Sequence, residues 1–237
     1  HDVPEPVMNS HQVIVGLDDL FVSPVAIDLS ATPTLAICGP DLSGRTSSIS
    51  WVAQSLKSSI PELVTIYVAG RGDPPPGAGN WTHVFNGFES FLETLEAFVA
   101  TIEEHGSVNP PLLVAIDDCD EMIANPIGLA PAEVQLRKRL ATAMDAVHRA
   151  GRNAGVTLVI AGRLSGLSSA VPWAQRFKQN QQALLLAPAS LDITVTDPVF
   201  QVQLPRRTGF RPTPGSAIVL RRGEATRLVQ MVLAGEP

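Results

Sequence analysis

TLAICGPDLSGRTSS, residues 34–48, is the stretch that decides the fold of this chain. It joins a short apolar run to a turn of glycine and polar residues, and then to the start of a helix. Gly39 and Gly44 stand where the pattern G-x-x-x-x-G-K-[ST] places its two glycines, Thr46 supplies the hydroxyl, and Arg45 takes the lysine position. A loop that leaves a buried strand and enters a helix can point several backbone N–H groups inward, and the helix N-terminus adds partial positive charge. The spacing therefore predicts a phosphate-binding loop.

The predicted phosphate site extends over the whole turn and into the first helical residues. We expect the backbone of this segment to hold ATP and the hydroxyl of Thr46 to ligate Mg²⁺. The same letters also fit a plain strand-to-helix turn, in which Pro40 and Arg45 close the loop and no nucleotide binds. The predicted cofactor-binding residues are Gly39, Pro40, Asp41, Leu42, Ser43, Gly44, Arg45, Thr46 and Ser47.

A second element, LLVAIDDCDE at residues 112–121, supports the phosphate interpretation. It is an apolar run that ends in two adjacent carboxylates, Asp117 and Asp118, which is the form of a Walker B strand. We expect Asp117 to hold a magnesium-bound water, so Thr46 and Asp117 are the predicted metal site and both aspartates are predicted catalytic residues. The two elements in this order indicate a P-loop nucleotide-binding core.

The composition bounds the class of protein. With 237 residues, of which 45% are hydrophobic and 17% charged, the chain is long and apolar enough for a globular α/β domain. The formal net charge of −6 gives no overall basic surface, so we expect no nucleic-acid partner.

Two cysteines, Cys38 and Cys119, lack the spacing of metal ligands, and we expect both to be buried, unbridged thiols. No apolar run approaches the ~20 residues that span a bilayer, and no signal peptide is recognisable, so we expect a soluble chain. Residues 1–10 are interpreted as a linker or a cloning remnant, and residues 11–237 as a single P-loop NTPase-like module.

Apolar runs that alternate with amphipathic segments predict the order of the elements. The segment 88–102 carries apolar residues three and four apart, which predicts an amphipathic helix. Residues 11–29 predict a strand pair before the core, and residues 217–234 predict a hairpin centred near Gly223 after it. The alternation indicates an α/β fold, a parallel sheet covered by helices on both faces, with added β-strands at the termini. The expected core strands are 35–38, 63–70, 83–85, 112–117, 156–163 and 183–188, and the other expected helices are 47–57 and 131–147.

Five segments occur together along the chain: GLDDLFVSPVAIDL (16–29), TLAICGPDLSGRTS (34–47), LLVAIDDCDE (112–121), LVIAGR (158–163) and PGSAIVLRRGEATRLVQ (214–230). This combination resembles the ATPase modules of EccC, the motor of type VII (ESX) secretion and a branch of the FtsK/SpoIIIE translocases. The resemblance extends from about Val13 to the end of the chain. The degenerate motifs are most similar to a later module of that multi-domain protein, the C-terminal one.

The resemblance implies a P-loop ASCE core of the FtsK/RecA-like type, with the 156–162 strand between the phosphate-loop strand and the Walker B strand. It implies a cytoplasmic location on the inner face of the cell membrane, as part of a membrane-anchored complex. It also implies two kinds of partner. These are other ATPase modules of the same motor, and a secreted helical-hairpin substrate of the Trp-x-Gly family that binds through its C-terminal signal.

Three residues depart from the pattern of an active module. Arg45 replaces a lysine, and its broad planar guanidinium differs from the compact point charge that follows the γ-phosphate through transfer. Asp118 stands where the family has glutamate, and a group misplaced by about 1 Å can cost on the order of a hundredfold in rate. Arg163 stands where a small polar sensor is expected. We therefore expect Mg-ATP binding with little or no hydrolysis by the module alone, and a role in substrate docking and assembly.

Two other functions stay open at the level of sequence. The module could be an ATPase that is active only in an oligomeric ring, with Arg71, Arg163 or Arg206 donated between neighbours. It could also be an FtsK-like DNA translocase, which the acidic balance and the lack of interleaved basic and aromatic residues disfavour.

The expected docking site for the signal helix is LSGLSSAVPWAQRF, residues 164–177. This segment is too apolar for an ordinary solvent loop, and an amphipathic helix binds to an apolar groove that accepts anchors at helical spacing. Packing of the same side chains onto the sheet is the alternative. The residues expected to line the groove are Leu164, Leu167, Val171, Trp173 and Phe177, with Trp173 as the main aromatic anchor.

Overall fold

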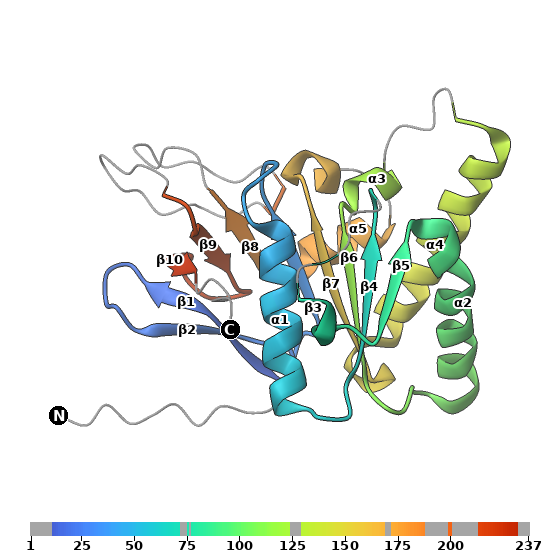
Figure 1. Cartoon of the computed structure of the whole chain (residues 1–237), viewed down its shortest axis with the longest axis horizontal. Coiled ribbons are helices and arrows are strands. Elements are labelled where there is room, and N and C mark those ends of the chain that lie inside the picture. The colour runs from blue at the N-terminus through green and yellow to red at the C-terminus, as the bar shows by residue number, and fades with distance from the viewer. Residues whose placement is uncertain are drawn as a thin grey trace.

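A computed structural model describes residues 11–71, 75, 77–123, 129–168, 172–187, 199–200 and 213–231. The strands are β1 (Gln12–Asp18), β2 (Pro24–Asp28), β3 (Thr34–Cys38), β4 (Val64–Ala69), β5 (His83–Asn86), β6 (Leu112–Asp117), β7 (Val156–Gly162), β8 (Ala183–Leu186), β9 (Ser216–Leu220) and β10 (Arg227–Met231). They form one sheet in the order β2-β1-β10-β9-β8-β3-β7-β6-β4-β5 (Figure 1). Residues 1–10, interpreted above as a linker or remnant, lie outside the described part of the chain.

The strands from β8 through β3, β7, β6 and β4 to β5 run parallel. β7 pairs with β3 on one side and with β6 on the other, which confirms the predicted strand order. All residues of β3, β6 and β7 are buried, because helices cover both faces, and this explains their nearly continuous apolar sequence. The carboxyl ends of these parallel strands meet at one edge of the sheet, which is where ligands bind in open α/β folds.

The terminal strands extend the same sheet in antiparallel fashion. β9 pairs with β8, β10 with β9, β1 with β10 and β2 with β1. The predicted strand pair and the predicted C-terminal hairpin are both confirmed. The sequence placed them as separate additions at the two ends of the chain, whereas the structure joins them, with Gly16 of β1 opposite Met231 of β10.

Helices cover both faces of the sheet, as predicted. α1 (Arg45–Ser59) lies on one face, and α2 (Phe88–His105), α4 (Pro131–Ala150) and α5 (Pro172–Asn180) lie on the other (Figure 1). The short elements are the helix α3 (Asp120–Ile123) and the 3-10 turns η1 (Ala78–Asn80), η2 (Gly151–Ala154) and η3 (Leu164–Ser168). Across the described residues, none of the helices has both the length and the apolarity that a bilayer-spanning segment requires.

The segment after β7 is more helical than the sequence predicted. No helix was expected between residues 163 and 183, but η3 and α5 occupy much of this segment, and Pro172 stands at the first position of α5, where proline is tolerated. Trp173 and Phe177 lie one turn apart on the buried side of α5, with ring centroids 6.2 Å apart in an edge-to-face arrangement.

This packing bears on the expected docking groove. Leu167, Trp173 and Phe177 are each 1% exposed and belong to the core, whereas Leu164 is partly buried against it. Val171 lies outside the described residues. The arrangement corresponds to the alternative in which these side chains pack onto the sheet. Partner binding by residues 164–177 stays a prediction, and it requires movement of core side chains.

The two cysteines are buried free thiols, as predicted. Cys38 ends β3 and Cys119 follows β6, one strand away. Burial raises the pKa of the Cys119 thiol well above its usual value, which makes the reactive thiolate scarce at neutral pH.

Candidate nucleotide site

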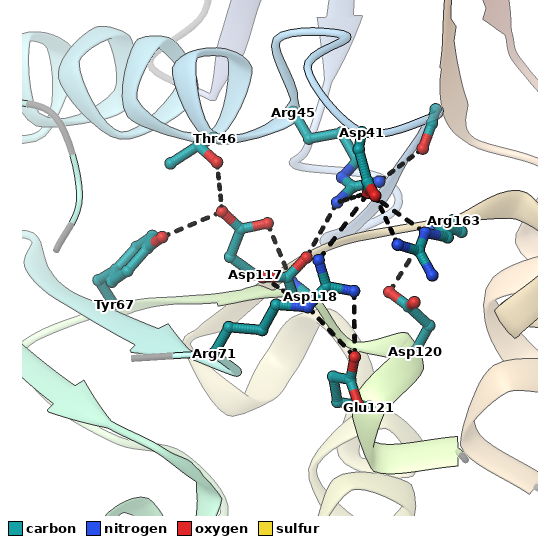
Figure 2. Close-up of polar contacts among 11 residues, drawn as sticks. Asp41, Arg45, Thr46, Tyr67, Arg71, Asp117, Asp118, Asp120, Glu121 and Arg163 are labelled. Atoms are coloured by element: carbon teal, nitrogen blue, oxygen red, sulfur yellow. Dashed lines mark hydrogen bonds and ion pairs between the residues drawn. The ribbon is translucent and has the colours of Figure 1, made fainter. Parts of the chain in front are cut away.

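Four strand ends bring the predicted site together. The loop 39–44 follows β3, Arg71 comes after β4, Asp117 ends β6 and Asp118 follows it, and Arg163 follows β7 (Figure 2). Because β3, β7, β6 and β4 are neighbours in that order, side chains separated by many tens of residues in sequence lie within contact distance.

The glycines of the loop have separate physical roles. A methyl group at Gly39 would collide with the Oγ of Ser43 and crowd the Cβ atoms of Leu186 and Ser43 at 3.0 and 3.1 Å, so a larger residue would have to shift these neighbours. Gly44 has a φ of 93°, in the left-handed region that glycine adopts without strain, and it directly precedes α1. The glycine positions predicted from the motif therefore fit a compact turn.

The loop presents polar groups that suit an anion. The first described hydrogen bond of the α1 backbone runs from the Ser48 N–H to the Gly44 carbonyl at 2.9 Å, so the preceding N–H groups have no partner within the helix. The Ser43 Oγ is buried and makes no hydrogen bond with any described residue. Unpaired donors at a helix N-terminus form an anion-binding site, and the loop fits the phosphates of a nucleotide.

Thr46 and Asp117 form the expected metal pair. The Thr46 hydroxyl donates to Asp117 Oδ2 at 2.6 Å, and the Tyr67 hydroxyl donates to the same oxygen at 3.0 Å. The backbone N–H of Asp118 donates to Asp117 Oδ1 at 2.9 Å, so both carboxylate oxygens are held in place. A hydroxyl and an oriented carboxylate are hard oxygen donors of the kind that bind Mg²⁺ together with waters and phosphate. These residues fit the predicted metal.

The Arg45 side chain is held by oxygen atoms of the protein. Its guanidinium donates to the Gly39 carbonyl at 2.6 Å and to Asp118 Oδ1 at 2.9 Å, and its side chain is only 8% exposed. A third contact reaches Asp41 at 3.3 Å. The residue in the lysine position is therefore engaged by the protein itself, with the loop backbone on one side and the Walker B carboxylate on the other.

Asp118 is correspondingly restrained. Its backbone has a φ of 49°, and its carboxylate contacts Arg45 and, at 3.9 Å, Arg71. Burial, and then the neighbouring Asp117 carboxylate, raise the pKa of Asp118, while the two arginines oppose that rise. A carboxylate in two ion pairs is poorly placed to orient an attacking water.

Two further arginines close the rim of the site. Arg71 pairs with Glu121 at 3.1 Å, and the Arg163 side chain pairs with Asp41 at 2.5 Å (Figure 2). The backbone N–H of Arg163 also donates to Asp120 at 3.2 Å. The sequence named Arg71 and Arg163 on charge alone, and the structure places both beside the loop; Arg206 lies outside the described residues.

The sequence missed three participants in the site. Tyr67 lies in the middle of an apolar run and gave no polar signal, although it is the only tyrosine of the chain. Asp120 and Glu121 were visible as an acidic continuation of the Walker B strand, but their pairing with Arg163 and Arg71 depends on strand order.

Comparisons with protein-family models and with curated proteins found no match. Solved structures, in contrast, match nearly the whole chain. ATPases 2 and 3 of Thermomonospora curvata EccC, in complex with a signal sequence peptide, superpose with a TM-score of 0.69 at 17% identity, over 99% of this chain and 42% of that one. ATPases 2 and 3 of EssC from Geobacillus thermodenitrificans give a TM-score of 0.68 at 20% identity, over 97% and 43%.

The chain has the fold of a type VII secretion ATPase module. The same fold occurs in the pCW3 conjugation coupling protein TcpA, solved with ATPγS, which matches with a TM-score of 0.71 at 17% identity over 95% of this chain and 66% of that one. The chain spans less than half the length of the EccC and EssC chains. The match therefore concerns the fold of one module and not the activity of a whole motor.

Proposed function

We propose that this chain is a degenerate nucleotide-binding module of a type VII secretion motor, which binds Mg-ATP with little or no hydrolysis and acts in substrate docking and assembly. The observation that carries the proposal is the contrast between two adjacent pairs. The Thr46 hydroxyl donates to the Asp117 carboxylate at 2.6 Å, an arrangement that suits Mg²⁺, whereas Arg45 and Asp118 bind each other at 2.9 Å.

The consequence for chemistry follows from what each side chain can do. The loop amides and Ser43 bind phosphate, and Thr46 and Asp117 hold Mg²⁺, which when bound neutralises phosphate charge. Phosphoryl transfer needs, in addition, a cation that follows the γ-phosphate and a base or acceptor that orients water. Both of these groups are engaged in the Arg45–Asp118 pair, which supports binding without turnover.

Calorimetry with Mg-ATP and a phosphate-release assay test this proposal together. We expect binding by the unmodified chain and loss of the magnesium-dependent part of the affinity in Thr46→Ala. We expect phosphate release well below the ~1 s⁻¹ of working enzymes. Steady release at about 1 s⁻¹ or faster by the monomer overturns the non-hydrolysing part, and absence of binding overturns the nucleotide part.

The double variant Arg45→Lys, Asp118→Glu tests the cause of the weak hydrolysis. It restores the residues of an active module and removes the guanidinium–carboxylate pair, so turnover should rise above that of the unmodified chain. If turnover appears in the unmodified chain only after concentration into oligomers, the ring-dependent ATPase is the better description.

The docking part of the proposal has independent support. The matching EccC structure contains a signal sequence peptide, and residues 164–177 remain the candidate docking site of this chain, with Leu167, Trp173 and Phe177 having to leave the core for a partner to bind. We propose a secreted helical-hairpin substrate of the Trp-x-Gly family as the partner, with neighbouring ATPase modules of the same motor, on the inner face of the cell membrane.

Photo-crosslinking tests the docking site. A peptide of the substrate's C-terminal signal, with a photoreactive group in its apolar face, should label residues 164–177, and unlabelled peptide should compete. Labelling confined to other segments would place the groove elsewhere, and no saturable labelling would argue against docking by this module.

A further inference from the structure

Three guanidinium groups converge on a single carboxylate in the phosphate loop. Asp41 accepts from Arg163 at 2.5 and 3.2 Å, contacts Arg45 at 3.3 Å, and lies 3.9 Å from Arg71 (Figure 2). The three arginines come from α1 and from the segments that follow β4 and β7. Asp41 is therefore the point at which three separate parts of the site meet.

Asp41 has more arginine partners than the other carboxylates nearby. Arg71 also contacts Glu121 and Asp118, and Arg45 also contacts Asp118, but only Asp41 contacts all three guanidinium groups among the described residues. The hydrogen bond from Arg163 lowers the pKa of Asp41; desolvation opposes this, and the charges of the three arginines add to the lowering, so this carboxylate is ionised at neutral pH.

Asp41 lies within the predicted phosphate-binding loop. It lies between Gly39 and Gly44, in the turn whose shape and unpaired amides fit phosphate. Arginine is suited to bidentate contact with both carboxylate and phosphate, because its planar fork of donors matches either group. The same three arginines that hold Asp41 are thus chemically fit to hold a terminal phosphate of a nucleotide.

The exposure of these side chains would allow an arginine to leave Asp41 and bind phosphate instead. The side chain of Asp41 is 49% exposed, and those of Arg163 and Arg71 are 45% and 35% exposed, whereas Arg45 is 8% exposed. Solvent-exposed ion pairs contribute little net stability, so release of Asp41 from Arg163 and Arg71 costs little. Arg45 is fixed by the Gly39 carbonyl and Asp118, which leaves Arg71 and Arg163 as the cations that can change partner.

We propose that Asp41 is an internal competitor for polyphosphate in the P-loop, and that Arg71 and Arg163 become phosphate ligands when a nucleotide displaces it. Two arginines on the rim then supply the charge that the diverted Arg45 does not. The inference rests on the proposed nucleotide binding by this loop, and it deepens that proposal by naming the ligands and the residue that sets the affinity.

Isothermal titration of Mg-ATP into three forms of the chain tests the inference. Asp41→Asn removes the competing charge, keeps the size of the side chain, and should tighten Mg-ATP binding by about tenfold, since one like charge no longer opposes the phosphates. Glu96→Gln is the matched control. It also removes one carboxylate paired with an arginine, Arg139 at 2.6 Å, but on the layer of α2 and α4, and it should leave the affinity unchanged.

A second pair of variants identifies the ligands. Arg163→Ala should weaken Mg-ATP binding, and its effect should be larger in the Asp41→Asn background, where Arg163 is free for phosphate. Inorganic pyrophosphate should follow the same order of affinities, because the proposed contacts are to phosphate and not to the base. Thermal melting of each variant without nucleotide confirms that it is folded.

The outcomes separate this inference from the proposed function. If the unmodified chain binds Mg-ATP, but Asp41→Asn binds with the same affinity as Glu96→Gln or more weakly, the competitor is refuted while nucleotide binding stands. If neither the unmodified chain nor Asp41→Asn binds Mg-ATP or pyrophosphate, both fail. If only Asp41→Asn binds Mg-ATP or pyrophosphate, the result supports Asp41 as the competitor and shows that its carboxylate prevents binding in the unmodified chain.

Discussion

Acidification should destabilise this fold through His148, in the last turn of α4. Burial, and then the charge of Arg176, lower the pKa of His148 from 6.5 to about 4, against the opposing charge of Asp145. The ring packs edge-on against Phe177 at 5.1 Å, and the Asn180 side-chain amide lies 3.1 Å from Nε2. A proton on Nε2 would replace an accepted hydrogen bond with a repulsive contact between donors.

The change in unfolding free energy with pH follows from the different pKa of His148 in the folded and unfolded chain. Above pH 6.5 the imidazole is neutral in both the folded and the unfolded chain, so it costs no stability there. As the pH falls from 6.5 toward 4, the unfolded chain takes up the proton first, and stability is lost. The difference between 6.5 and about 4 corresponds to at most about 3 kcal/mol, and we expect about 2 kcal/mol because the ring is partly exposed and screened.

Urea denaturation of the unmodified chain and of His148→Gln at several pH values measures this effect. Between pH 7.5 and 4.5 the unmodified chain should lose about 2 kcal/mol more unfolding free energy than the variant. The control is His105→Gln, since the His105 side chain is 63% exposed, and it should follow the unmodified chain. Parallel pH profiles for the unmodified chain and His148→Gln would refute the assignment.

Three further perturbations test other parts of the structure. Trp173→Ala should cost about 3–5 kcal/mol in unfolding free energy measured by chemical denaturation, because the ring is 1% exposed; a loss below about 1 kcal/mol would mean that the ring is not a core residue in solution. Tyr67→Phe removes one donor to Asp117 Oδ2, and we expect a several-fold loss of magnesium-dependent nucleotide affinity in a folded protein, whereas unchanged affinity would show that Thr46 alone orients the carboxylate. A thiol reagent should label neither Cys38 nor Cys119 until the protein is unfolded, so rapid labelling of the native chain would contradict their burial.

The sequence carried most of the core of the fold. The buried strands appear in the sequence as nearly continuous apolar runs, and the loop motif predicted where β3 ends and where α1 begins. The helix α5 was not predicted, because proline interrupts a helix unless it stands in the first turn, and the sequence alone did not show that Pro172 holds that position. The pairing of β1 with β10 was also hidden, since a strand pattern does not state its partner.

The chemistry of the site was predictable in outline but not in detail. The motif spacing predicted Thr46 and Asp117 as site residues, and in the structure Thr46 Oγ1 lies 2.6 Å from Asp117 Oδ2. The direction of the Arg45 side chain depends on Asp118, which lies 73 positions along the chain, and the convergence on Asp41 depends on the order of β3, β7, β6 and β4. Such contacts arise only after the strands assemble, so no local pattern encodes them.

The position of β10 between β1 and β9 has a consequence for biosynthesis. β1 and β2 leave the ribosome first among the described strands, but a two-stranded ribbon is marginal by itself, and its open edge can pair with other chains. That edge is covered only when β10, the last described strand, has been made, because Gly16 finds its partner in Met231. The β1–β2 ribbon therefore keeps an open edge until β10 has been translated, and it can pair with other chains throughout that interval.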